Sequence, residues 1–195
     1  VRAYTKPGEA VLLQQPVYYP FSEVIADNER VIVNSSLKLI DGHYEIDFDD
    51  FEQKIRDNNV KLFLLCSPHN PVGRVWKKWE LEKIGEICIR YGVIVVSDEI
   101  HSDFTWGENK HLMFASLSDD FANISITCTA PSKTFNLAGL QVSNIFIPNE
   151  TLRLKFKKAV DAAGYSQVNV MGLEACQAAY EYGEDWLTQL KAYLT

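Results

Sequence analysis

The chain has 195 residues, a length that allows one substantial hydrophobic core or at most two small ones. Apolar residues make up 47% of it and charged residues 23%, as in an ordinary globular protein. The net charge of -7 argues against a nucleic-acid or anionic-membrane surface, because either would need clustered lysine and arginine. No apolar stretch approaches the ~18 residues of a membrane span. There is no signal-peptide pattern either, so we expect a cytoplasmic protein.

The elements follow from hydrophobic periodicity and from cap and turn residues. In chain order we predict the tail of a helix over residues 1–4, a strand over 11–15, a helix over 21–27, a strand over 30–34 and a helix over 47–57. A strand over 62–66, a helix over 77–91 and strands over 93–97, 124–128 and 144–147 follow. Helices over 150–163, 170–182 and 184–194 end the chain. The first helix starts and the last one stops without a cap. We therefore expect a domain excised from a longer chain.

Strands that are apolar throughout indicate burial on both faces. Alternation of such strands with helices predicts an α/β fold, a three-layer α/β/α sandwich with a mostly parallel sheet and right-handed crossovers. One domain over residues 1–195 is the economical division. The four cysteines form no C-x-x-C pair, and buried reduced thiols are favoured over disulfides or zinc: Cys66, Cys88, Cys128 and Cys176.

Polar residues cluster where four predicted strands end. The clusters occupy residues 67–71, 97–101 and 129–133, and residues 15–19 bring aromatic side chains to the same edge. Ligands of parallel sheets bind at the carboxyl ends of the strands. The coincidence of these four clusters therefore predicts a binding site at this edge.

Two side chains in these clusters suggest chemistry. Lys133 stands beside Ser132 and before the apolar Phe135, so we expect it to be partly shielded from water and available as a nucleophile toward a carbonyl. A solvated loop lysine is the alternative, and general surface preferences favour it. Asp98 follows an apolar strand and needs a partner, such as a protonated pyridine nitrogen. Capping of the following turn explains Asp98 equally well.

The sequence gives weaker support for a metal site or a nucleotide site. His69 and His101 could join Asp98 and Glu99 at a metal, but their spacing matches no metal motif, and we expect no metal site. Neither G-x-G-x-x-G nor G-x-x-x-x-G-K-[ST] occurs, which excludes the common nucleotide motifs.

Three segments resemble the signatures of fold-type I pyridoxal-phosphate (PLP) enzymes, the aspartate-aminotransferase superfamily. They are residues 70–73 (Asn-Pro-Val-Gly), 97–101 (Ser-Asp-Glu-Ile-His) and 132–140 (Ser-Lys-Thr-Phe-Asn-Leu-Ala-Gly-Leu), and their order and separations match as well. The resemblance covers nearly the whole chain. Residues 67–76, 98–103 and 138–141 are similar to the bacterial cystathionine β-lyase branch, whose members cleave carbon–sulfur bonds.

The resemblance implies a large PLP-binding domain and a role for each matched residue. Lys133 would hold PLP as a Schiff base and then carry the proton of the substrate α-carbon. Asp98 would pair with the pyridinium nitrogen, and Asn70 would donate to the phenolic oxygen of the ring.

Three further cofactor contacts are implied. Tyr18 would stack on the ring face, with Tyr19 as the fallback, and Ser132 would help bind the phosphate. His101 falls where many relatives have a tyrosine that contacts the phenolic oxygen.

The sequence departs from the family pattern at Gln141. Relatives that transaminate commonly have a phosphate-binding arginine there, and the lyase branch tends to share the change. The family's phosphate loop would precede Val1 and its carboxylate-binding arginine would follow Thr195, so we expect residues 1–195 alone to be catalytically weak. The family also implies a homodimer of the full-length protein.

Three hypotheses follow. The first is a PLP-dependent C–S lyase that acts on cystathionine or a related S-substituted cysteine, a small amino-acid substrate, and releases a thiol, pyruvate and ammonia. The second is a PLP-dependent aminotransferase, which shares every motif. The third is a regulatory relative of the fold that works through protein contacts; intact Lys133, Asp98 and Asn70 argue against loss of the cofactor.

Overall fold

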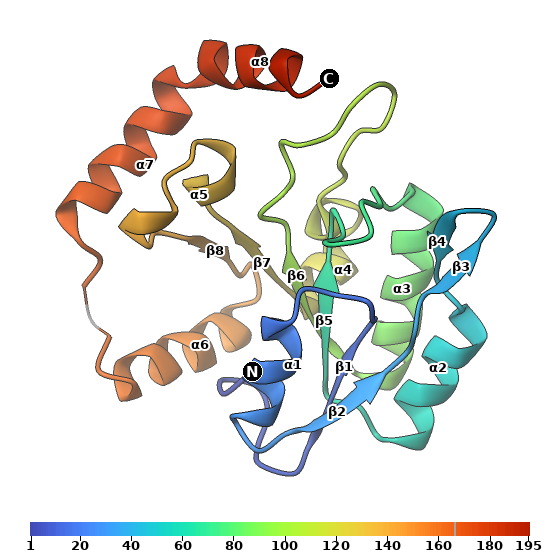
Figure 1. Ribbon diagram of the computed structural model, residues 1–195. Coiled ribbons are helices and arrows are strands. Elements are labelled where there is room, and N and C mark those ends of the chain that lie inside the picture. The colour runs from blue at the N-terminus through green and yellow to red at the C-terminus, as the bar shows by residue number, and fades with distance from the viewer. Residues whose placement is uncertain (166) are drawn as a thin grey trace.

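The structure is a computed structural model that describes residues 1–165 and 167–195. Its centre is a six-stranded sheet with the order β2-β1-β5-β6-β7-β8 (Figure 1). Every neighbouring pair is parallel except β7 and β8. The strands are β1 (Ala10–Leu13), β2 (Val31–Asn34), β5 (Leu62–Cys66), β6 (Ile94–Asp98), β7 (Ser125–Thr129) and β8 (Asn144–Phe146).

Helices cover both faces of this sheet. The larger core lies against α2 (Phe48–Asp57), α3 (Lys78–Tyr91) and α4 (Asp119–Ile124). On the opposite face, α1 (Pro20–Ala26) covers β1 and β5, and α6 (Glu150–Ala162) packs near β7 and β8. Figure 1 shows α2 and α3 together on one side and α1 and α6 on the other. The predicted mostly parallel α/β sandwich is confirmed.

Local signals set the element boundaries close to their predicted positions. Asp47 is the N-cap of α2, since its side chain accepts a hydrogen bond from the Asp50 N–H at 3.2 Å. Helix α3 ends at Gly92, whose φ of 66° lies in the left-handed region that glycine adopts without strain. The chain then turns directly into β6. Strand β6 runs one residue further than predicted and includes Asp98.

Some elements were not predicted, and one prediction was wrong. Residues 2–4 form a turn rather than the end of a helix. A small antiparallel hairpin, β3 (Lys38–Ile40) with β4 (His43–Glu45), lies apart from the main sheet. Its strands have three residues each and no fully buried side chain, so they leave little apolar pattern to read. Short helices η1 (Phe114–Ser116), α5 (Pro131–Thr134) and η2 (Ala138–Leu140) lie in segments for which the sequence predicts neither helix nor strand.

Two helices complete the described chain, α7 (Val170–Tyr182) and α8 (Glu184–Tyr193). They form the arc at the upper left of Figure 1 and lie beyond α5. Phe135, directly after α5, packs edge-on against Tyr180 of α7, with ring centroids 5.5 Å apart. Among the described residues, no helix combines the length and apolar character needed to cross a membrane.

Candidate active site

The carboxyl ends of three central strands meet side by side. Cys66 at the end of β5 is the register partner of Asp98 on β6, and Asp98 is the partner of Cys128 on β7. The loop after β1 joins this edge as well, because the Tyr18 N–H donates to the Asn70 carbonyl at 3.0 Å. The sheet thus gathers side chains from four separate segments.

A cavity of about 520 Å³ opens at this edge. All six residues predicted to bind or react line it: Tyr18, Asn70, Asp98, His101, Ser132 and Lys133. Gln141, the position that departs from the transaminase pattern, lines it too. The sequence is therefore correct about which residues come together.

Asp98 is the partly buried acid of the cavity. One of its oxygens accepts the Ile100 N–H at 3.2 Å. Burial raises the pKa of Asp98, the neighbouring Glu99 adds to the rise, and the Ile100 hydrogen bond opposes it. A buried carboxylate of this kind gains from a cationic partner, and a protonated ring nitrogen would supply one.

Lys133 lies in α5, a single turn begun by Pro131. The turn is held in place because the hydroxyl of Thr134 donates to an Asp103 carboxylate oxygen at 2.7 Å. The predicted shielding of Lys133 is wrong for this structure: the residue is exposed, because the cavity that it lines opens to solvent. His101 is half-buried, and burial followed by the charge of Lys133 lowers its pKa, which favours the neutral imidazole.

Tyr18 and Asn70 form the wall on the β1 and β5 side. Tyr18 keeps 43% of its surface exposed, and its ring lies 5.4 Å from that of Tyr19. The Asn70 N–H donates to the sulfur of Cys66 at 3.3 Å, which fixes the loop at the strand end. Burial raises the pKa of Cys66 to about 12, so its thiol stays protonated. Cys66 was predicted as a buried thiol, and its place on the cavity wall was missed.

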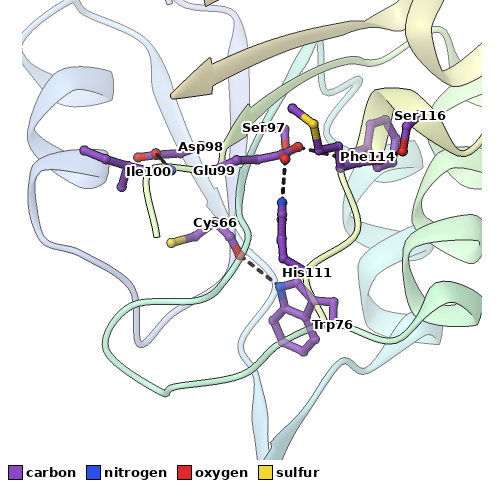
Figure 2. A network of polar contacts seen from close by, with 10 residues as sticks. Cys66, Trp76, Ser97, Asp98, Glu99, Ile100, His111, Phe114 and Ser116 are labelled. Carbon is purple, nitrogen blue, oxygen red and sulfur yellow. Dashed lines mark hydrogen bonds and ion pairs between the residues drawn. The ribbon is translucent and has the colours of Figure 1, made fainter. Parts of the chain in front are cut away.

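Behind the cavity, Glu99 is a fully buried carboxylate with three partners (Figure 2). The Ser97 hydroxyl and the Phe114 N–H donate to one oxygen at 2.9 and 3.1 Å, and His111 Nε2 lies 2.6 Å from the other. Glu99 and Asp98 leave the strand end in opposite directions. Because successive side chains along a strand point to opposite faces, Asp98 lies at the cavity and Glu99 lies in a hydrogen-bonded network that ties the loop after β6 to the core.

The arrangement of possible metal ligands in the described residues does not support the alternative of a metal site. Across residues 1–165 and 167–195, no group of three or more histidine, cysteine, aspartate or glutamate side chains is placed to hold an ion. His69 is buried, and its Nε2 lies 3.3 Å from the carbonyl oxygen of Gln14.

The residues of the cavity suit PLP by their chemistry. They offer an amine for the aldehyde and a carboxylate for the ring nitrogen. A tyrosine ring is available for stacking, and a serine hydroxyl for an anionic group.

Comparison with known proteins defines the family. Residues 1–194 match the family model of aminotransferase class I and II, and the chain belongs to that family. It is 50% identical over 194 residues to cystathionine β-lyase PatB of Bacillus subtilis, a match that covers 100% of this chain and 50% of the relative. Protein MalY of Escherichia coli is 36% identical over 100% of this chain and 49% of its own length.

Solved structures show the same fold. Cystalysin of Treponema denticola, described as containing pyridoxal 5'-phosphate, has a TM-score of 0.96 and 44% identity, covering 98% of this chain and 49% of that one. A PLP-bound C–S lyase from Staphylococcus hominis has a TM-score of 0.89 and 39% identity over 99% of this chain and 49% of its own. The chain therefore spans about half the length of these relatives.

Proposed function

We propose that residues 1–195 form the large PLP-binding domain of a carbon–sulfur lyase that acts on cystathionine or a related S-substituted cysteine. The products would be a thiol, pyruvate and ammonia. The observation that carries this proposal is one cavity that brings Lys133, Asp98 and Asn70 together at the carboxyl edge of the sheet. The lyase names of the similar proteins support the reaction class.

Each side chain has a proposed task. Lys133 would hold the cofactor through its aldehyde, and its Nζ would accept the α-proton of the substrate. When bound, PLP supplies an electron sink that stabilises negative charge at the substrate α-carbon. Asp98 holds a proton on the ring nitrogen, because a carboxylate shielded from water favours a cationic neighbour.

The remaining residues orient the ring. Asn70 and His101 both line the cavity and are assigned to the phenolic oxygen. A neutral His101 can donate one hydrogen bond there without adding a second positive charge beside Lys133. Tyr18 stacks on the ring and Ser132 binds the phosphate. Gln141 can contact the phosphate by hydrogen bonds but does not supply the charge of an arginine.

The proposal also covers the cellular compartment and the oligomeric state of the protein. All four cysteines are free thiols, as expected in a reducing compartment, and we place the protein in the cytoplasm. The full-length enzyme is proposed to be a homodimer, as the family resemblance implies.

Pyruvate release from cystathionine and from S-substituted cysteines tests the proposal. The complete holoenzyme is expected to release pyruvate, and Lys133→Ala to abolish the release. Tyr182→Ala, at an exposed tyrosine on α7 outside the cavity, is the matched control and is expected to leave the rate unchanged. Amino transfer to a keto acid without pyruvate release would replace the lyase with an aminotransferase.

A further inference from the structure

Helix α5, which carries Lys133, is too short to set its own orientation. It has four residues, and a single turn is marginal in isolation because nucleation fixes several dihedral angles for one hydrogen bond. The Phe135 N–H closes the turn by donating to the Pro131 carbonyl at 2.9 Å. The Leu137 N–H donates to the Ser132 carbonyl at 3.1 Å. The direction of Lys133 therefore depends on contacts with other parts of the chain.

Thr134 makes a contact that reaches out of this turn. Its side chain is fully buried and follows directly after the exposed Lys133. Its hydroxyl donates to a carboxylate oxygen of Asp103 at 2.7 Å, across 31 positions of the chain. A hydrogen bond to an ionised acceptor is roughly twice as strong as one between neutral groups. The bond therefore fixes the turn to the loop after β6.

Asp103 is itself held by α8. The Nζ of Lys191 donates to the main-chain carbonyl of Asp103 at 2.8 Å, across 88 positions of the chain. The same ammonium lies 6.0 Å from the centre of the Trp106 ring, and the indole N–H lies 3.5 Å from the Lys191 carbonyl oxygen. Figure 1 shows this loop, in yellow-green, reaching toward the end of α8. Asp103 thus contacts α5 through its side chain and α8 through its main chain.

The base of the loop is anchored as well. Glu99 and His111, 12 positions apart, contact each other at 2.6 Å and close the loop that carries Asp103 (Figure 2). The Phe114 N–H, just after the loop, donates to Glu99 at 3.1 Å. Because both ends of the loop are tied to the buried Glu99, Asp103 has little freedom to follow a moving turn. A displacement of the turn would therefore break the bond between Thr134 and Asp103.

We propose that Asp103 and Lys191 are positioning residues for Lys133: α8 fixes the main chain of Asp103, and Asp103 fixes the turn that holds the Lys133 amine at the cavity. The consequence for the reaction rests on the proposed lyase function. A misplacement of about 1 Å at a reacting group costs roughly a hundredfold in rate. Neither Asp103 nor Lys191 lines the cavity that the described residues form. Loss of their contacts is therefore expected to lower kcat and to leave KM nearly unchanged.

Kinetics of the complete holoenzyme with cystathionine test the contact at α5. Thr134→Val removes the hydroxyl at nearly constant volume, and Thr134→Ser keeps it. Thr134→Val is expected to lower kcat roughly ten- to hundredfold with little change in KM, and Thr134→Ser to retain most of kcat. The deuterium isotope effect on kcat for substrate labelled at the α-carbon is expected to rise in Thr134→Val, because proton transfer to a displaced Nζ is slower. A change in KM alone, or equal losses in the two variants, would overturn the inference.

Lys191→Met tests the contact at α8 and leaves α5 intact. It keeps an aliphatic chain and removes the donor to the Asp103 carbonyl. It is expected to lower kcat roughly three- to tenfold, the effect of one hydrogen bond, with KM unchanged. Lys158→Met, at an exposed lysine on α6, is the matched control and should leave both constants unchanged. A Lys191→Met enzyme that behaves like Lys158→Met would refute the link to α8.

Hydrogen exchange of the complete protein tests the contacts without the reaction. The amides of Phe135 and Leu137 report opening of the turn, since both donate within it. Their exchange is expected to accelerate roughly tenfold in Thr134→Val, less in Lys191→Met, and not in Lys158→Met. Unchanged exchange in both of the first two variants would refute the positioning role. Accelerated exchange in a protein that releases no pyruvate from any substrate would support the contacts and refute the lyase.

Discussion

His69 makes the stability of this fold sensitive to mild acid. Its ring is buried between the β1 and β5 ends, 3% exposed, and lies edge-on to Trp76 with centroids 5.6 Å apart. Its Nδ1 has no hydrogen-bond partner among residues 1–165 and 167–195. Burial lowers the pKa of His69 from the ordinary value of 6.5 to about 4, and the charge of Arg74 adds to the lowering.

The size of the effect follows from the two pKa values. Above pH 6.5 neither the folded nor the unfolded chain binds the proton. Between 6.5 and about 4 only the unfolded chain binds it, so the free energy of unfolding falls as the pH falls. Each pH unit in this window is worth about 1.4 kcal/mol, and the full loss is about 3 kcal/mol. Below pH 4 both states are protonated and the loss stops growing.

Urea unfolding at a series of pH values between 7 and about 4 measures this loss. His69→Gln removes the titrating group and keeps an amide that can donate to the Gln14 carbonyl. The variant is expected to lose less stability than the wild type as the pH falls, with a difference that grows to about 3 kcal/mol. Parallel curves for the two proteins would refute the reasoning, because carboxylates elsewhere contribute equally to both.

Three further predictions concern the core and the cofactor. Glu99→Ala is expected to lower the free energy of unfolding by about 3–5 kcal/mol because it leaves buried donors without their acceptor, and Glu99→Gln by less; equal losses in denaturant titrations would contradict this. Gly85→Ala should cost about 1–3 kcal/mol in thermal unfolding because the added methyl overlaps the Phe121 ring, while Gly139→Ala, with open space around it, should show no such overpacking loss. Asp98→Asn should weaken cofactor retention roughly ten- to hundredfold in equilibrium dialysis, since a charge-assisted hydrogen bond is lost; unchanged retention would speak against the assigned role.

The sequence predicts the parts of this fold that are long and apolar. Strand β5 was predicted with its observed bounds because Leu62–Cys66 is buried throughout and flanked by turn residues. The hairpin of β3 and β4 was missed because exposed three-residue strands carry no burial pattern. The antiparallel direction of β8 was also beyond reach, since strand polarity depends on the path of the chain between β7 and β8.

The same limit applies to the site. Strand-exit clusters locate Asp98 and Lys133, because parallel strands bring their carboxyl ends to one edge. Alternation along β6 decides that Asp98 rather than Glu99 faces the cavity, and the structure adds that His111 pairs with Glu99. That pairing depends on how the loop folds back, and no local pattern encodes it. The exposure of Lys133 likewise depends on the open shape of the cavity.

The account depends most on a covalent bond between PLP and Lys133. The direct measurement is an absorbance spectrum of the purified holoenzyme, followed by borohydride reduction and mass spectrometry of its peptides. We predict a band at the violet edge of the visible range that borohydride bleaches, with the reduced cofactor on Lys133. A protein without this band, or one with the reduced cofactor on another lysine, would contradict the assignment.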